Sequence, residues 1–92
     1  MTKKIYSELE AENHRQLLQW GIQNHSISDW LMIIGEEFGE ACQSGVEVKF
    51  SSNEVKRRER LEELRAELVQ LSAVTAAMID SLDRNELCKD YR

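Results

Sequence analysis

The sequence is 92 residues long, 41% hydrophobic, and has a formal net charge of −5 at pH 7. A chain of this length can bury only a small core, so we expect one domain over residues 1–92 that associates with copies of itself. The acidic balance argues against a nucleic acid polymer as partner, because an extended interface with phosphates requires a basic surface.

Composition also indicates the fold class and the compartment. With no proline and only four glycines, the chain favours long helices joined by short turns, so we expect an all-α fold. It has no run of about 18 or more apolar residues, and its N-terminus turns acidic at once, which predicts a cytoplasmic protein with neither a membrane span nor a signal peptide. Cys42 and Cys88 lack a metal-binding spacing and are expected to be free thiols in that reducing compartment.

The first predicted helix covers residues 2–20 and ends at Gly21, a typical C-terminal glycine. Amides and an indole share its inward arc with aliphatic residues. Asn13 and Gln16 offer both donor and acceptor groups, which suit the edge of a base, a neighbouring loop or a subunit contact. Trp20 is either a stacking platform for a base or a core residue. The full arc contains Ile5, Tyr6, Leu9, Asn13, Gln16, Leu17 and Trp20.

The second predicted helix starts with Ser28 as N-cap and continues to about Lys49. Its inward arc contains Trp30, Ile33, Ile34, Phe38, Ala41, Gly45 and Val48. Glu37 falls within this apolar arc, Glu40 lies at its edge, and Glu36 points further out. An uncompensated buried charge is costly, so Glu37 and Glu40 call for a positive partner.

The third predicted helix runs from a cap at Asn53 to about Leu82 and contains no charge from Leu68 to Ile79. Its apolar seam consists of Leu61, Leu64, Leu68, Leu71, Thr75, Met78 and Leu82. Ala73, Ala76 and Ala77 form a small-residue face opposite that seam, which we expect to pack between chains in a homodimer or homotetramer. Residues 83–92 are expected to add a short terminal helix.

Carboxylates from the two long helices are the candidate chemical groups. Glu37 and Glu40 are three residues apart, hence on one helix face, and Glu67 has Gln70 as its i+3 neighbour. If the two helices pack antiparallel, three carboxylates and an amide oxygen converge at one boundary of the core. Such oxygens suit magnesium or manganese, which in turn bind phosphates. The alternative is a solvated acidic face, as we expect for Glu62 and Glu63.

These residues resemble a known family. "WLMIIGEEFGEACQ" followed by "ELVQ" resembles the MazG-like group of the all-α nucleoside triphosphate pyrophosphatases, whose signature is Glu-Glu-x-x-Glu, a spacer, then Glu-x-x-Asp. The segment "RQLLQWGIQNHSISDW" is similar to the stretch that precedes this motif in some relatives. The resemblance implies an oligomeric helical bundle with two long antiparallel core helices. It also implies magnesium-dependent hydrolysis of a (deoxy)nucleoside triphosphate to the monophosphate and pyrophosphate.

Carried over residue by residue, the resemblance assigns Glu37, Glu40 and Glu67 as metal ligands and, with Glu36, as the catalytic carboxylates. Glu36 matches the first glutamate of the motif and is expected either to hydrogen-bond a water or to face solvent. Gln70 stands where the family has aspartate, which keeps an oxygen ligand but removes a negative charge.

A second departure affects phosphate binding. Gln19 stands where relatives often have lysine, so we expect the phosphate contact to come from Lys49, Lys56, Arg57 or Arg58. The substrate-binding candidates are therefore Asn13, Gln16, Trp20 and Lys49. The two departures leave open a catalytically weak or inactive nucleotide-binding or interaction module, and a purely structural helical adaptor is a third possibility.

Overall fold

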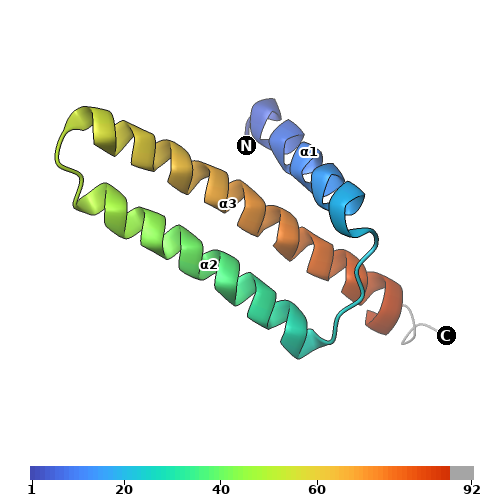
Figure 1. Ribbon diagram of the computed structural model, residues 1–92. Coiled ribbons are helices and arrows are strands. Elements are labelled where there is room, and N and C mark those ends of the chain that lie inside the picture. The colour runs from blue at the N-terminus through green and yellow to red at the C-terminus, as the bar shows by residue number, and fades with distance from the viewer. Residues whose placement is uncertain (88–92) are drawn as a thin grey trace.

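The computed structural model describes residues 1–87 as three α-helices followed by a short π-helical turn (Figure 1). The elements are α1 (Lys3–Trp20), α2 (Ile27–Lys49), α3 (Glu54–Leu82) and η1 (Asp83–Leu87). The all-α prediction is confirmed for this part of the chain. Cys88 and the rest of the expected terminal helix lie outside the described residues.

Side-chain caps set where α1 and α3 begin. The Thr2 hydroxyl accepts a hydrogen bond from the Ile5 amide at 3.3 Å, and the Asn53 carbonyl oxygen accepts one from the Lys56 amide at 2.9 Å. Each cap satisfies an amide that has no partner within its helix. Gly21 ends α1 with φ 72°, a conformation that glycine adopts without strain. These ends agree with the sequence prediction.

The start of α2 differs from the prediction. Ser26, rather than Ser28, is the N-cap, and its hydroxyl accepts a hydrogen bond from the Asp29 amide at 3.2 Å. Both serines offer a suitable oxygen, but a cap bonds the amide three residues ahead. In α2 that amide belongs to Asp29, so the helix begins at Ile27 and Ser28 lies inside its first turn.

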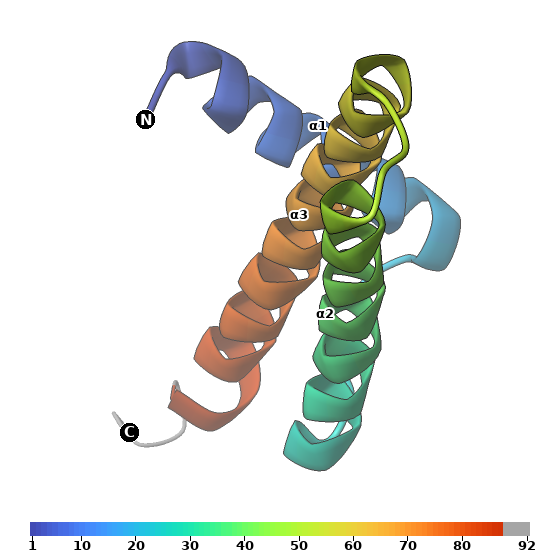
Figure 2. The same ribbon diagram turned by 90° about the vertical axis from the view of Figure 1, so that its left-hand side faces the viewer.

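The two long helices form an antiparallel hairpin, and α3 is the central helix of the fold (Figures 1 and 2). Within the described residues, α3 packs against both α2 and α1, whereas α1 and α2 do not pack against each other. The molecule is elongated, with extents of 57 × 29 × 24 Å. Two ion pairs tie the helices together, Arg65 with Glu8 of α1 and Arg60 with Glu47 of α2.

The core within one chain is small. Trp30, Ala41 and Ala73 are the buried hydrophobic residues among those described, and Ser44 and Ser81 are buried with them. Ala73 is fully buried inside the chain, so it is not part of a face left free for another subunit, contrary to our expectation. The reason is the central position of α3, which is covered on more than one side.

Several residues assigned to inward arcs are exposed in the single chain. Phe38 is 58% exposed and Leu68 46% exposed, although both belong to the apolar arcs of the long helices. The same holds for three residues of α1: Tyr6, Leu17 and Trp20. A helical wheel identifies residues that share a face, but whether that face is covered depends on the neighbouring helices.

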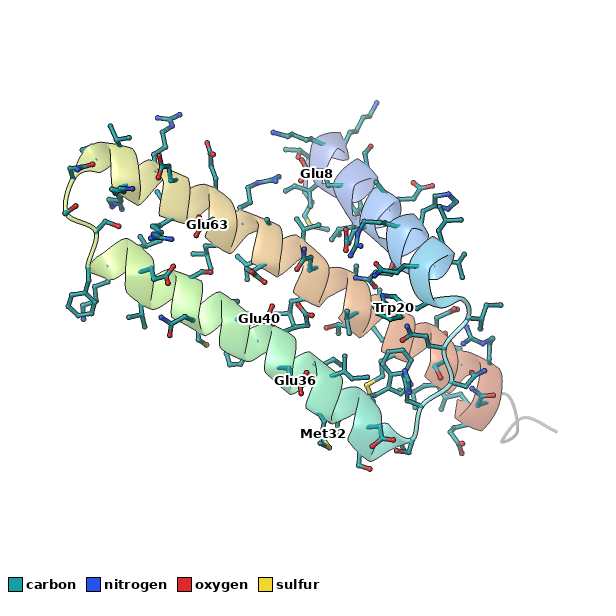
Figure 3. The ribbon with its side chains drawn as sticks, in the orientation of Figure 1. Glu8, Trp20, Met32, Glu36, Glu40 and Glu63 are labelled. Atoms are coloured by element: carbon teal, nitrogen blue, oxygen red, sulfur yellow. The ribbon has the colours of Figure 1, made fainter. Side chains whose placement is uncertain are left out.

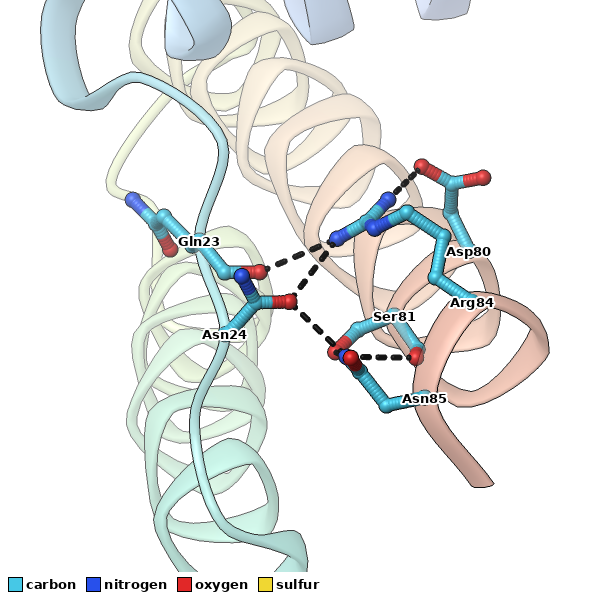
Figure 4. A network of polar contacts seen from close by, with 6 residues as sticks. All are labelled: Gln23, Asn24, Asp80, Ser81, Arg84 and Asn85. Carbon is cyan, nitrogen blue, oxygen red and sulfur yellow. Dashed lines mark hydrogen bonds and ion pairs between the residues drawn. The ribbon is translucent and has the colours of Figure 1, made fainter. Parts of the chain in front are cut away.

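The connection between α1 and α2 is fastened to the end of α3 (Figure 4). Arg84 donates hydrogen bonds to the Gln23 carbonyl and to the Asn24 side chain, both at 3.2 Å, and forms an ion pair with Asp80. Asn85 donates to the same Asn24 oxygen at 2.8 Å. These contacts hold the connecting segment against the C-terminal end of α3. Among residues 1–87, no helix has the length and apolarity needed to cross a membrane.

Candidate metal centre and adjoining cleft

Three carboxylates converge between α2 and α3. Glu37 and Glu40, from consecutive turns of α2, meet Glu67 of α3, and one oxygen from each lies within 4.8 Å of the others. The antiparallel packing of the hairpin makes this possible, because it brings the middle of α2 beside the middle of α3. Figure 3 shows Glu36 and Glu40 along α2. The structure thus brings together the three glutamates that the sequence proposed as ligands.

Two of these carboxylates are partly buried and lack a hydrogen-bond partner for the buried oxygen. One oxygen of Glu37 and one of Glu67 are buried and have no hydrogen-bond partner. Burial raises the pKa of Glu37, and the nearby carboxylates of Glu40, Glu12 and Glu36 raise it further. Burial, followed by the adjacent Glu40, likewise raises the pKa of Glu67. Buried oxygens of this kind normally have a donor or a cation as partner.

A cleft of about 860 Å³ opens beside the carboxylates. Its walls come from the C-terminal half of α1, the following connection, the first half of α2 and the second half of α3. Glu36, Glu37 and Gln70 line it, so the carboxylate cluster adjoins the cleft through Glu37. Clefts of roughly 300–1,000 Å³ are typical of small-molecule sites.

Amide and aromatic side chains make up much of the remaining lining. Asn13, Gln16 and Trp20, which the sequence proposed as substrate-binding residues, all line the cleft. Trp20 is 60% exposed, so its ring is accessible to a ligand. Trp30 is 2% exposed and contacts His25 edge to face, with ring centroids 4.8 Å apart. Trp30 is therefore a core residue at the cleft, whereas Trp20 is the free aromatic surface.

The cleft contains a cation that sequence reasoning missed, Arg15. Its guanidinium donates to both oxygens of Glu12, at 2.6 to 3.0 Å, and to the Gln19 side-chain oxygen at 2.8 Å. The hydrogen bond from Arg15 lowers the pKa of Glu12 and thus favours its ionised form. The sequence signal that could have identified Arg15 is its position one turn before Gln19, on the same helix face.

Lys49, in contrast, does not come near the cleft. It lies at the C-terminal end of α2, with its ammonium 5.6 Å from the centre of the Phe50 ring. Twelve residues of helix separate it from Glu37, a distance of about 18 Å. Lys56, Arg57 and Arg58 are in the first turns of α3, at the same end of the hairpin. Within one chain, the expected phosphate contacts from these residues are therefore not formed.

No protein-family model matches the sequence, and no curated protein or solved structure matches it.

Proposed function

We propose that this protein is a magnesium-dependent nucleoside triphosphate pyrophosphohydrolase of the MazG-like kind, which converts a (deoxy)nucleoside triphosphate to the monophosphate and pyrophosphate. One observation carries the proposal. Two buried carboxylate oxygens without partners, on Glu37 and Glu67, meet a third carboxylate at the edge of a cleft of nucleotide size. A cation would neutralise these oxygens, and the open cleft would admit its phosphate ligands.

The residues present fit a hard divalent cation. Glu37, Glu40 and Glu67 supply oxygen ligands, and Gln70 offers an amide oxygen one turn from Glu67 along α3. Magnesium and manganese accept such oxygens and are commonly held by a few carboxylates together with substrate phosphates. When bound, the cation supplies charge neutralisation for the phosphates and acidifies a coordinated water.

The remaining lining residues have roles in binding and orientation. Arg15 and Arg84 are the arginines that line the cleft, and the charge of Glu37 acts on Arg15. The guanidinium N–H groups of Arg15 that do not bind Glu12 or Gln19 can donate hydrogen bonds to a phosphate. Trp20 offers a ring face to a base, and Asn13 and Gln16 offer amides to its edge. Glu36 is exposed in the cleft, where it can accept a hydrogen bond from an attacking water.

The working form proposed here is a homo-oligomer, a dimer or a tetramer. Both long helices expose large apolar side chains, among them Leu31 and Phe38 of α2 and Leu68 of α3. Contiguous exposed apolar surface is uncommon on monomers and marks interaction sites.

Pyrophosphate release is the decisive assay. Ordinary and modified nucleoside triphosphates are incubated with the protein in magnesium, in manganese and in chelator. We expect turnover that requires the metal, that is abolished in Glu37→Gln and that is retained in Glu62→Gln, an exposed glutamate of α3 outside the cluster. Equal turnover in wild type and Glu37→Gln would refute the assignment of the site.

A second function is favoured by one observation, the presence of Gln70 where the family signature has aspartate. With one negative charge fewer, the site holds a cation less tightly and could serve to bind nucleotides without cleaving them. Metal-dependent nucleotide binding by calorimetry, with no pyrophosphate released by the same sample, would establish this module in place of the enzyme. Absence of both responses would indicate a structural adaptor.

A further inference from the structure

The cleft has a floor formed by one face of α3 and its continuation into η1. Gln70, Val74, Ala77, Asp80 and Arg84 all line the cleft. They follow one another at intervals of three or four residues, so they lie on one side of the helix. Gln70 and Asp80 are about 15 Å apart along the helix axis. The floor is therefore polar at both ends and apolar between them, where Val74 and Ala77 lie.

The two polar ends of the floor suit different parts of a ligand. Gln70 and Glu37 line the cleft where it adjoins the carboxylate cluster, and a cation held there offsets the charge of phosphates. At the other end, the carboxylate of Asp80 accepts hydrogen bonds but donates none, so it does not bind phosphate oxygens. A nucleotide with its phosphates at the cation would therefore have its base toward Asp80.

Asp80 is held in place at its end of the floor (Figure 4). Arg84 forms an ion pair with one oxygen of Asp80. The same guanidinium donates to the Gln23 carbonyl and the Asn24 side chain, both at 3.2 Å, so the connection between α1 and α2 fixes its position. Among residues 1–87, no residue other than Arg84 bonds the Asp80 carboxylate. The Asp80 side chain is 71% exposed, and its second oxygen is therefore accessible to a ligand.

A carboxylate in this position discriminates between bases. Cytosine and adenine carry an exocyclic amino group, which is a donor, whereas thymine has a carbonyl oxygen in the place of the cytosine amino group. The carboxylate accepts a hydrogen bond from the amino group and repels the carbonyl oxygen, because both oxygens are acceptors. Trp20, which is 60% exposed, lines the same cleft and offers its ring face to the base.

We propose that Asp80, held by Arg84, selects nucleotides whose base carries an exocyclic amino group, such as cytosine or adenine, over nucleotides with a carbonyl in the same place. The inference rests on the proposed function, because phosphates bound to the cation direct the base toward Asp80. It adds the substrate class to that function, and it assigns Asp80 to recognition of the base and not to the chemistry.

Matched nucleotide pairs test this assignment. Deoxycytidine and deoxyuridine triphosphates, and deoxyadenosine and deoxyinosine triphosphates, differ in the amino or carbonyl group alone. From pyrophosphate release with magnesium, we expect kcat/KM to favour the amino member of at least one pair by about ten-fold or more. Asp80→Asn, whose amide both donates and accepts, should bring that ratio close to one. Asp83→Asn is the control and should keep the wild-type ratio, since Asp83 is exposed and does not line the cleft.

The ratio separates recognition from stability, because a variant that merely loosens the fold lowers kcat/KM for both members of a pair alike. Equal kcat/KM within both pairs, or an unchanged ratio in Asp80→Asn, would overturn this inference and leave the proposed enzyme standing. If none of the four nucleotides is turned over, calorimetric titration with magnesium gives the same ratio from Kd values. A ratio lost in Asp80→Asn would then support base selection by a binding module, and binding of none of the four would overturn both proposals.

Discussion

Replacing Glu67 with glutamine should make the metal-free protein more stable while removing its response to magnesium. The oxygens of the three carboxylates lie within 4.8 Å of one another. At that distance two ionised groups repel by about 0.9 kcal/mol at the dielectric constant of water and about 3.5 kcal/mol at the effective value of 20 used near protein surfaces. Because Glu40 is exposed, solvent screening favours the lower figure, roughly 1 kcal/mol. For a domain of this size that corresponds to about 4–8 °C in Tm.

Thermal unfolding followed by circular dichroism, at one protein concentration, measures both effects. In chelator, Glu67→Gln should melt about 4–8 °C above wild type. With magnesium at about 100 times its Kd, wild type should gain about 2.7 kcal/mol of stability, whereas Glu67→Gln should gain little. Glu62→Gln serves as control and should behave like wild type. A lower Tm for metal-free Glu67→Gln, or an undiminished magnesium effect, would refute the assignment of Glu67 as a ligand held in place against repulsion.

Three further outcomes are expected. The raised pKa values of Glu37 and Glu67 mean that their contribution to stability is fully present below the unfolded pKa of about 4.3 and is lost as pH rises through the raised folded values. The increase in Tm caused by magnesium should therefore grow from pH 5 to pH 8, and a magnesium effect that is constant over this range would contradict it. Gln70→Asp restores a charge and should lower the Kd for magnesium about ten-fold in a calorimetric titration; unchanged affinity would exclude Gln70 from the site. Arg15→Met should reduce kcat/KM about ten-fold by removing a charged phosphate contact, with magnesium binding retained and Arg57→Met unaffected.

Local signals in the sequence predicted the helices well. Caps and glycine act within a few residues, so Gly21 and Asn53 mark the ends of helices as expected, and α1 begins one residue after the predicted start at Thr2. At α2 two serines compete for the same role, and only the position of the first bonded amide shows that Ser26 is the cap. The choice between two similar caps is decided by small differences in backbone geometry that a sequence does not display.

The sequence was sufficient to predict the carboxylate cluster, which lies within the α2–α3 hairpin. Glu37 and Glu40 share a helix face, and a short link between two long helices makes Glu67 their neighbour. Arg15 could not be placed in the same way, because its position depends on how α1 crosses α3. Lys49 is a different case, because its distance from Glu37 follows from the length of α2 alone. Phe38 shows the same limit as Arg15, because its face has no cover within the chain.

The small core of the single chain has a consequence for how the protein stays folded. With Trp30, Ala41 and Ala73 as its buried hydrophobic residues, the described part of the chain retains little hydrophobic stabilisation of its own. A second copy bound to the exposed apolar side chains of α2 and α3, as proposed above, would act as a ligand that binds only the folded form. The Tm should rise with protein concentration, and the amount of protein synthesised in a cell would itself determine what fraction of it is folded.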